Sequence, residues 1–494
     1  MNIFINFATE METRSQNIIG RQEELRILQD AVNSSESEFV AIYGRRRVGK
    51  TYLVNKAFKG KFAFQYTGLE NKNNKEQLEA FHMALINQGL PKCPKPKTWI
   101  EAFYQLQHLL EDVRADSLVN GKKVVFLDEL PWMDVPRAGF VEALGNFWNR
   151  WAAWTEDIVL IICGSATSWM FNKVLRNHGG LYNRITKRIP VYPFCLAECE
   201  QLCKRMMLGW NRKQIVEAYM ILGGIPHYWT KFKKDQSLPA NVDRLFFRRG
   251  AEMKDEYDAL FSSLFSHPEV YENIINSISQ RKKGLSLKEI SESSGYKLSG
   301  RLSTILKNLE LCGFIEKVSQ PNKRKRDATY QLVDNFVLFY HEFILKKDVE
   351  SNFWSTHFKT HAHSSWSGLA FERVCFQHRN QIAKALGISG VYTNWYAWSA
   401  EPDKEHGYPG MQVDMVIDRA DDVVNLCEAK YSTKPFAITP GYMEDLHMRQ
   451  GRYQEEVSPK KAVHLTMITA YGIVDNPQKY EINSFVELDD LFLP

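Results

Sequence analysis

An apolar segment followed by a glycine-rich basic loop constrains this chain more than any other feature. Residues 39–43 (Phe-Val-Ala-Ile-Tyr) have the composition of a buried strand, and the run from Gly44 to Thr51 fits the pattern G-x-x-x-x-G-K-[ST]. The residues after Thr51 continue with the spacing of a helix. A strand, a loop and a helix in this order predict the phosphate-binding loop of a nucleotide-hydrolysing α/β domain.

Each residue type in this loop has a chemical reason. The glycines let backbone N–H groups turn towards phosphate oxygens, and the following helix directs its positive end at them. We expect Lys50 to reach the β and γ phosphates of ATP and Thr51 to offer its hydroxyl to Mg²⁺. The other predicted nucleotide-binding positions are Gly44, Arg45, Arg46, Arg47, Val48 and Gly49, of which the three arginines have solvated surface charge as an alternative role.

A second signature lies downstream, where an apolar run ends in two acids. Residues 124–130 read Val-Val-Phe-Leu-Asp-Glu-Leu, so Asp128 and Glu129 stand at the end of a predicted strand. We expect Asp128 to hold Mg²⁺ through water and Glu129 to polarise the attacking water. The alternative is an ordinary helix cap after a strand. The matched pair of signatures favours ATP binding and hydrolysis.

Composition sets the scale of the protein and its surroundings. A chain of 494 residues with ordinary apolar and charged content predicts two to four domains with adequate cores. No run of eighteen apolar residues occurs, and the amino terminus lacks the features of an export signal, so we expect the cytoplasm and no membrane partner. The formal charge of +5 is too small to require a nucleic-acid partner, which leaves that question to local clusters.

Two basic clusters in the middle third, residues 281–283 and 323–326, accompany a segment with the pattern of a winged helix. The spacing predicts helices over residues 270–278, from Ser286 onward and over residues 299–311. Residues 314–318 and 328–332 alternate like two strands of a hairpin, with the basic run 323–326 at its tip. In such a module the third helix enters the major groove of DNA and the wing contacts phosphates.

This pattern assigns DNA contacts to four basic side chains. They are Arg301 and Lys307 on the third helix, and Arg324 and Arg326 in the wing. Winged helices also serve as protein-docking or linker modules, and a charge run is often only a solvated surface, so both alternatives stay open.

The last third of the chain contains a second acidic constellation. Asp414 lies in the alternating segment 412–417, and Glu428 and Lys430 follow in the segment 426–430. Side chains alternate along a strand, so Glu428 and Lys430 project from one face, and a hairpin would bring Asp414 beside them. Two carboxylates and an amine would then converge.

Cleavage of a phosphodiester needs side chains of these types. Carboxylates hold Mg²⁺ ions that stabilise the developing charge, and a lysine orients or deprotonates the attacking water. Glu372, on a helix predicted over residues 369–376, is a candidate additional metal ligand beside Asp414 and Glu428. The alternative is an exposed, ion-paired strand edge. The succession of a helix, two strands and the later strand 462–469 is typical of a small α/β nuclease core.

These motifs together resemble the prokaryotic archaeal-type ATPases of the AAA+ and STAND-like P-loop lineage. Residues 19–25 (Ile-Gly-Arg-Gln-Glu-Glu-Leu) look like that family's opening motif, and residues 223–226 (Gly-Gly-Ile-Pro) look like its helical-lid signature. The carboxy-terminal region is similar to a domain that many of these ATPases carry, which resembles nucleases of the PD-(D/E)xK group. Val413 stands where the proline of that name would lie.

The resemblance implies two further roles. Ser165, after the apolar run 158–163, stands where such ATPases place a polar sensor of the γ-phosphate. Arg184 looks like the family's arginine that senses or completes a nucleotide site, in this subunit or a neighbouring one, which makes a homo-oligomer an open expectation.

The predicted fold class is α/β, with four segments in order. They are a P-loop ATPase domain with a small helical lid (1–235), a connector (236–264), a winged-helix domain (265–345) and a restriction-endonuclease-like domain (346–494). One hypothesis is an ATPase that binds DNA and cleaves it with Mg²⁺ under nucleotide control. The other is an ATP-switched regulator of DNA or protein whose last domain binds without cutting; ATP-driven protein remodelling without DNA affinity is a further alternative.

Overall fold

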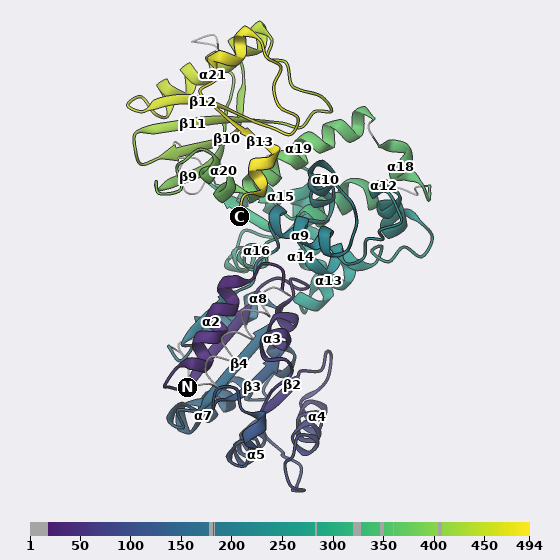
Figure 1. Cartoon of the computed structure of the whole chain (residues 1–494), viewed down its shortest axis with the longest axis vertical. Helices are drawn as coiled ribbons and strands as arrows, with labels where there is room; N and C mark the ends of the chain where they lie inside the picture. Colours follow the sequence, from purple (N-terminus) through teal and green to yellow (C-terminus); the bar gives the residue numbers. More distant parts are fainter. Residues whose placement is uncertain are drawn as a thin grey trace. The chain divides into compact units, whose positions relative to one another are not determined.

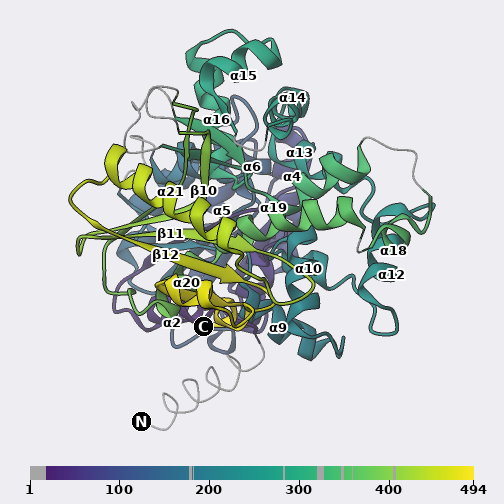
Figure 2. The same ribbon diagram turned by 90° about the horizontal axis from the view of Figure 1, so that it is seen from above.

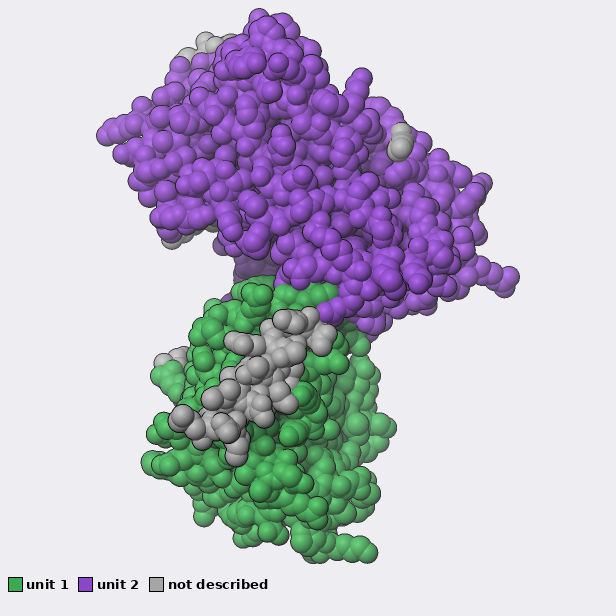
Figure 3. All heavy atoms as spheres, in the orientation of Figure 1, with its two compact units in different colours: residues 1–193, 263–265 green, residues 194–262, 266–494 purple. Residues whose placement is uncertain are grey.

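The computed structural model describes residues 18–176, 181, 183–281, 284–319, 328–345, 350–358, 360–403 and 408–494. The chain divides into two compact units, residues 1–193 with 263–265, and residues 194–262 with 266–494 (Figure 3). The division falls within the predicted first domain, between its sheet and the helices expected to form its lid. Among the described residues, no helix combines the length and apolar character needed to span a membrane.

Unit 1 is built around a parallel sheet whose strands are apolar because helices cover them (Figure 1). The strand order is β2-β3-β4-β1-β5, and every neighbouring pair is parallel. The strands are β1 (Glu38–Tyr43), β2 (Phe64–Thr67), β3 (Lys123–Asp128), β4 (Ile158–Gly164) and β5 (Lys187–Pro190). This sheet confirms the predicted α/β class and the three strands expected at residues 39–43, 124–128 and 158–163.

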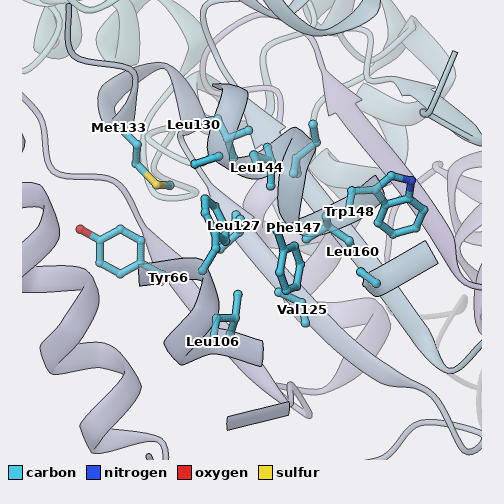
Figure 4. Packing of buried hydrophobic residues seen from close by; sticks show 14 of the residues in the cluster. Tyr66, Leu106, Val125, Leu127, Leu130, Met133, Leu144, Phe147, Trp148 and Leu160 are labelled. Carbon is cyan, nitrogen blue, oxygen red and sulfur yellow. The ribbon is translucent and has the colours of Figure 1, made fainter. Parts of the chain in front are cut away.

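The helices of unit 1 bury an aromatic layer against this sheet. Phe103 stacks on Phe147 with ring centroids 5.4 Å apart. Phe147 belongs to one buried cluster with Leu127 and Leu160 of the sheet (Figure 4). The main helices are α2 (Gln22–Asn33), α3 (Lys50–Phe58), α4 (Asn74–Asn87), α5 (Trp99–Glu111) and α7 (Phe140–Arg150), with the short helices α6 (Leu130–Met133) and α8 (Thr167–Trp169) following strands.

Strand order brings three sequence-distant loops to one edge of the sheet. β4 lies between β1 and β3, and all three run in the same direction, so their carboxyl ends share an edge. The loops after these strands carry the glycine-rich run, the acidic pair and Ser165. In open parallel sheets this edge is where ligands bind.

Unit 2 begins with helices that dock on more distant parts of the same unit. α10 (Arg212–Leu222) packs on α17 (Asn335–Phe339) and α19 (His361–Gln377). Asn335 of α17 links α10 to α19, because its Nδ2 donates to Tyr219 O at 2.9 Å and to Gln377 Oε1 at 3.1 Å. The other helical elements here are α9 (Leu196–Arg205), α11 (Pro226–Trp229), α12 (Leu238–Val242), π-helical η4 (Asp243–Phe247) and α13 (Glu256–Leu264).

The middle of unit 2 holds three helices and a small antiparallel sheet. α14 (Pro268–Ser279), α15 (Leu287–Ser294) and α16 (Gly300–Leu311) coincide with the predicted helices, and α15 begins with a capping box between Ser286 and Glu289. The sheet order is β6-β8-β7, with β6 (Leu285–Ser286), β7 (Ile315–Val318) and β8 (Thr329–Leu332). The predicted hairpin is confirmed in β7 and β8, whereas its basic tip lies outside the described residues.

The carboxy-terminal part of unit 2 is a five-stranded mixed sheet of order β13-β12-β11-β10-β9. β9, β10 and β11 are antiparallel neighbours, and β12 and β13 add in parallel. α19 and α21 (Pro440–Glu456) pack on this sheet (Figure 2). The strands are β9 (Thr393–Ala400), β10 (Met411–Arg419), β11 (Val423–Lys430), β12 (Ala462–Thr469) and β13 (Ser484–Glu487), with π-helical η6 (Tyr340–Ile344), α18 (Phe353–His357) and α20 (Arg379–Ala385) preceding them.

Candidate functional site

The glycine-rich loop has a backbone that its sequence explains. Gly44 has φ of 148°, and a Cβ at this position would lie 2.2 Å from Val191 O, so only glycine lets the two backbones approach this closely. Gly49, at φ 94°, caps the amino end of α3. The loop therefore connects β1 to the positive end of a helix, the arrangement that binds phosphate.

Lys50 lies buried at the start of α3, where its amine is held over the loop. Its Nζ donates to Gly44 O and to Arg45 O, both at 2.9 Å, and to Ser165 Oγ at 3.1 Å. These three acceptors aim a cation at the inside of the loop. A nucleotide phosphate oxygen would be a stronger, charged partner for the same amine.

Thr51 and Asp128 form the second part of the site. The Thr51 hydroxyl donates to Asp128 Oδ2 at 2.7 Å, while Asp128 is buried and Thr51 is exposed. A hydroxyl and a carboxylate are the hard oxygen donors that Mg²⁺ takes together with water and phosphate. The two residues therefore fit the predicted role of holding Mg²⁺ beside a nucleotide.

Ser165 connects the loop lysine to the predicted water-polarising acid. Its hydroxyl donates to Glu129 Oε1 at 2.6 Å, and its backbone N–H donates to Glu129 Oε2 at 3.1 Å. Glu129 itself has a left-handed backbone with φ of 49°, which turns the chain sharply after β3. The chain Lys50, Ser165, Glu129 thus runs across the ends of β1, β4 and β3.

Arg21 supports the loop from the side and has a role that spacing did not predict. Its guanidinium donates to Val48 O at 3.1 Å and to Tyr192 O at 2.7 Å, and it pairs with Glu24 at 3.3 Å. It therefore ties the phosphate loop to the segment after β5. Its place in the motif of residues 19–25 was the only sequence signal for it.

For the remaining predicted nucleotide-binding residues, the structure gives the position and the degree of burial. Arg184 is exposed in the turn before β5, and its backbone N–H donates to Leu181 O at 3.1 Å. Its role as a nucleotide sensor stays a prediction. Arg45, Arg46 and Arg47 lie in the loop itself, where each is partly buried.

A second cluster forms in the mixed sheet of unit 2, where Asp414 and Glu428 come from the paired strands β10 and β11. Asp414 Oδ2 accepts a hydrogen bond from Ala429 N at 3.1 Å. A β-bulge lies here, because Val413 pairs with Trp398 and Val416 pairs with Tyr396. Bulges of this kind redirect a side chain and occur beside functional sites. The predicted hairpin is therefore present, with Asp414 in the bulge.

Three donors surround the Glu428 carboxylate, which is only 6% exposed. Arg449 donates to Oε1 at 2.7 Å, whereas Lys430 and the Tyr442 hydroxyl donate to Oε2 at 3.1 Å and 2.9 Å. Glu428 and Lys430 share a face, as the alternation predicted. Sequence reasoning missed Tyr442 and Arg449, although their spacing of seven places them on one face of a helix.

Burial and neighbouring negative charge raise the pKa values of two acids in this cluster, Asp414 and Glu372. Burial raises the pKa of Asp414 to about 6, and the Glu428 carboxylate adds to the rise. Burial likewise raises the pKa of Glu372 to about 7, and the Asp414 carboxylate adds to that rise. Burial lowers the pKa of Lys430, but the Glu428 carboxylate, Tyr442 and Asp414 together outweigh burial and leave that pKa above the ordinary value. Lys430 is therefore a charged donor rather than a ready base.

The fit of this cluster to a metal is incomplete as it stands. Within the parts of the chain that the structure describes, no group of three His, Cys, Asp or Glu side chains is arranged to hold a metal ion. Oxygen donors of the right type are present in Glu372, Asp414 and Glu428. The Glu428 oxygens, however, already accept hydrogen bonds from protein donors.

The predicted DNA contacts fall on two segments. Arg301 and Lys307 are exposed on α16, whose opposite side buries Leu302, Ile305 and Leu309. Arg324 and Arg326 lie outside the described residues. The first pair therefore lies on the solvent side of its helix, and the wing assignments stay predictions.

Comparison with known proteins gives a family match for the first part of the chain. Residues 18–232 match a family described as an ATPase domain predominantly from Archaea. An uncharacterized protein of Methanocaldococcus jannaschii is 27% identical over 373 residues, covering 74% of this chain and 78% of that protein. An uncharacterized ATP-binding protein of the same organism is 42% identical over 43 residues, covering 9% of this chain and 73% of that protein.

Solved structures with similar folds include a Walker-type ATPase of Pyrococcus abyssi, at TM-score 0.45 and 19% identity, covering 66% of this chain and 97% of that one. The Orc1 protein of Aeropyrum pernix, solved in complex with DNA, has TM-score 0.35 and 14% identity, covering 66% and 92%. The match of residues 18–232 to an ATPase domain family supports a P-loop ATPase, and the contacts among Lys50, Ser165, Thr51 and Asp128 are consistent with it.

Proposed function

We propose that this protein hydrolyses ATP with Mg²⁺ at the loop of residues 44–51, and that nucleotide state controls a DNA-binding and DNA-cleaving part in residues 265–494. The observation that carries the ATPase chemistry is the hydrogen-bonded chain from Lys50 through Ser165 to Glu129. It places a cation, a neutral donor and a carboxylate along one edge of the sheet.

The chemistry follows from what each side chain offers. Lys50 and the N–H groups of the loop bind the β and γ phosphates, and Thr51 and Asp128 would hold Mg²⁺, which would supply positive charge to the phosphate oxygens. Ser165 stands between Lys50 and Glu129 and orients both. Glu129 positions the attacking water and accepts its proton, as a carboxylate with a free lone pair does.

The DNA-binding part of the proposal is supported by the middle of unit 2. Three helices precede and interleave with a β6-β8-β7 sheet, and the third helix, α16, carries Arg301 and Lys307 on its exposed side. This element order supports the assignment of a winged helix. We assign Arg301, Lys307, Arg324 and Arg326 to phosphate contacts that give affinity without sequence readout.

The cleavage part is supported by the proximity of Asp414, Glu428 and Lys430 on β10 and β11, and by Glu372 on α19, whose pKa the Asp414 carboxylate helps to raise. Asp414, Glu428 and Glu372 would hold Mg²⁺, and Lys430 would orient the attacking water as a charged donor.

A second candidate function is an ATP-switched binding protein that does not cut. The observation that favours it is the ion-paired state of Glu428, whose carboxylate contacts Arg449 at 2.7 Å and Lys430 at 3.1 Å. In that case the carboxy-terminal domain binds the phosphates of DNA through its basic side chains and does not cleave them. ATP-driven remodelling of proteins is the remaining alternative, and it predicts no DNA affinity at moderate salt.

A cleavage assay on supercoiled and linear DNA with Mg²⁺, with and without ATP, separates these functions. The wild-type chain is compared with Asp414→Ala and Lys430→Ala, and with Asp445→Ala, an exposed acid on α21, as the matched control. We expect cutting that both site variants lose and the control keeps. DNA binding without cutting under every condition would establish the second candidate.

A further inference from the structure

The Glu428 carboxylate, which we propose as a ligand of Mg²⁺, already contacts a positively charged side chain of the protein, Arg449. Arg449 contacts Oε1 at 2.7 Å, and the other oxygen accepts from Lys430 and Tyr442. Buried carboxylates need such partners, because an unpaired charge that is removed from water strongly destabilises the fold. A divalent cation and Arg449 therefore compete for the same oxygen.

Arg449 differs from Lys430 in where it comes from. Lys430 lies two residues from Glu428 on the same strand, so its place beside the carboxylate is fixed by β11. Arg449 reaches across from α21 on a long side chain that is 23% exposed. The helix itself is anchored by Met443, Leu446 and Tyr453 in the core under the sheet. Release of the Glu428 Oε1 atom thus requires only a side-chain rotation of Arg449, while Lys430 and Tyr442 keep their contacts with Oε2.

We infer that Arg449 is an internal cation that holds the carboxy-terminal acidic site closed, and that a divalent cation binds Glu428 only when Arg449 leaves it. This inference rests on the proposed cleavage function of that site. A phosphodiester is the partner that draws a guanidinium away, because its two non-bridging oxygens share a negative charge and match the geometry of the guanidinium N–H groups. DNA and the divalent cation therefore bind this site cooperatively, and the site stays closed without DNA.

The test measures Mn²⁺ binding by electron paramagnetic resonance on the full chain without nucleotide. Each measurement is made with and without a short duplex DNA. The Mn²⁺ binding that is lost in Asp414→Ala is attributed to the carboxy-terminal site. We expect Arg449→Met to bind Mn²⁺ at this site about tenfold more tightly than wild type, the loss of one charge-assisted contact. DNA should raise the Mn²⁺ affinity of wild type and leave that of Arg449→Met unchanged. Lys460→Met, which removes an exposed charge of the same domain, is the control.

Tyr442→Phe provides a second variant that keeps the ring and removes one donor to Glu428, and it should tighten Mn²⁺ binding by a smaller factor. Asp414-dependent binding that is equal or weaker in both variants would overturn the role of Arg449 while leaving the metal site intact. No Asp414-dependent binding in wild type or either variant, with or without DNA, would overturn the proposed metal site and this inference together.

Discussion

The Ser165 hydroxyl lies 2.6 Å from Glu129 Oε1 and 3.1 Å from the Lys50 amine, so one small side chain joins the phosphate loop to the acid that we propose to position the attacking water. Replacing Ser165 with alanine removes two hydrogen bonds to charged groups, one from the Lys50 amine and one to the Glu129 carboxylate. We expect Ser165→Ala to lower kcat for ATP hydrolysis by about tenfold to a hundredfold, with little change in ATP affinity. Steady-state hydrolysis and a separate binding titration measure the two quantities. Ser168→Ala in the same segment is the control, and an unchanged kcat for Ser165→Ala would contradict the role.

We expect nucleotide affinity to depend most on Lys50. Its amine is held by two loop carbonyls at 2.9 Å, ready for a phosphate. Lys50→Ala should weaken ATP binding by about a hundredfold or more, because it removes a charge-assisted contact to phosphate. Fluorescent-nucleotide titration gives the dissociation constant. Lys56→Ala, an exposed lysine on the same helix, should bind like wild type. Tight ATP binding by Lys50→Ala would refute the loop assignment.

Asp414 predicts a pH dependence of stability. Its pKa rises to about 6 in the folded chain from an ordinary value of 3.8, so the folded state binds more protons between these values and stability falls as pH rises through them. Asp414→Asn keeps an oxygen for the Ala429 N–H and removes the charge. We expect it to stabilise the protein at pH 8 by about 1–3 kcal/mol and to lose that advantage towards pH 4. Thermal unfolding at several pH values tests this, and an advantage that grows on acidification would be the opposite of the prediction.

The exposed side of α16 predicts a salt-dependent DNA affinity. Neutralising Arg301 and Lys307 together should weaken binding to unrelated sequences equally and reduce the slope of log affinity against log salt by roughly two, about one per lost phosphate contact. Fluorescence anisotropy over a series of salt concentrations measures that slope. Lys384→Ala, an exposed lysine on α20, controls for net charge. The wing variants Arg324→Ala and Arg326→Ala should act in the same direction, and an unchanged slope would remove these residues from the interface.

Gly224 predicts a packing constraint in the helical segment after the ATPase sheet. A Cβ at this position would lie 1.8 Å from the carbonyl oxygen of Phe194. The backbone N–H of Phe194 also donates a hydrogen bond to Gly224 O at 2.6 Å. Gly224→Ala should therefore destabilise unit 2 by about 3 kcal/mol. Gly451, inside α21, has no neighbouring atom within 4 Å of such a Cβ, so Gly451→Ala should stabilise by about 1 kcal/mol. Thermal unfolding of both variants gives the comparison, and equal effects of the same sign would contradict it.

The sequence by itself determined the local elements and the identity of the nucleotide site. The strand at residues 39–43, the helix after Lys50 and the strand 462–469 follow from periodicity, and the loop chemistry needs those residue types at that spacing. The hairpins β7–β8 and β10–β11 were also predictable, because short connections between alternating segments give antiparallel neighbours.

Only the tertiary structure decided what lies between and around these elements. The position of β4 between β1 and β3 is what puts Ser165 between Lys50 and Glu129, and strand order is a property of the whole sheet rather than of any one segment. The bulge at Val413–Val416 and the contact of Arg449 with Glu428 depend on the pairing with β9 and on the docking of α21. Local spacing governs only neighbours along the chain, whereas these relationships arise from packing between segments far apart in sequence.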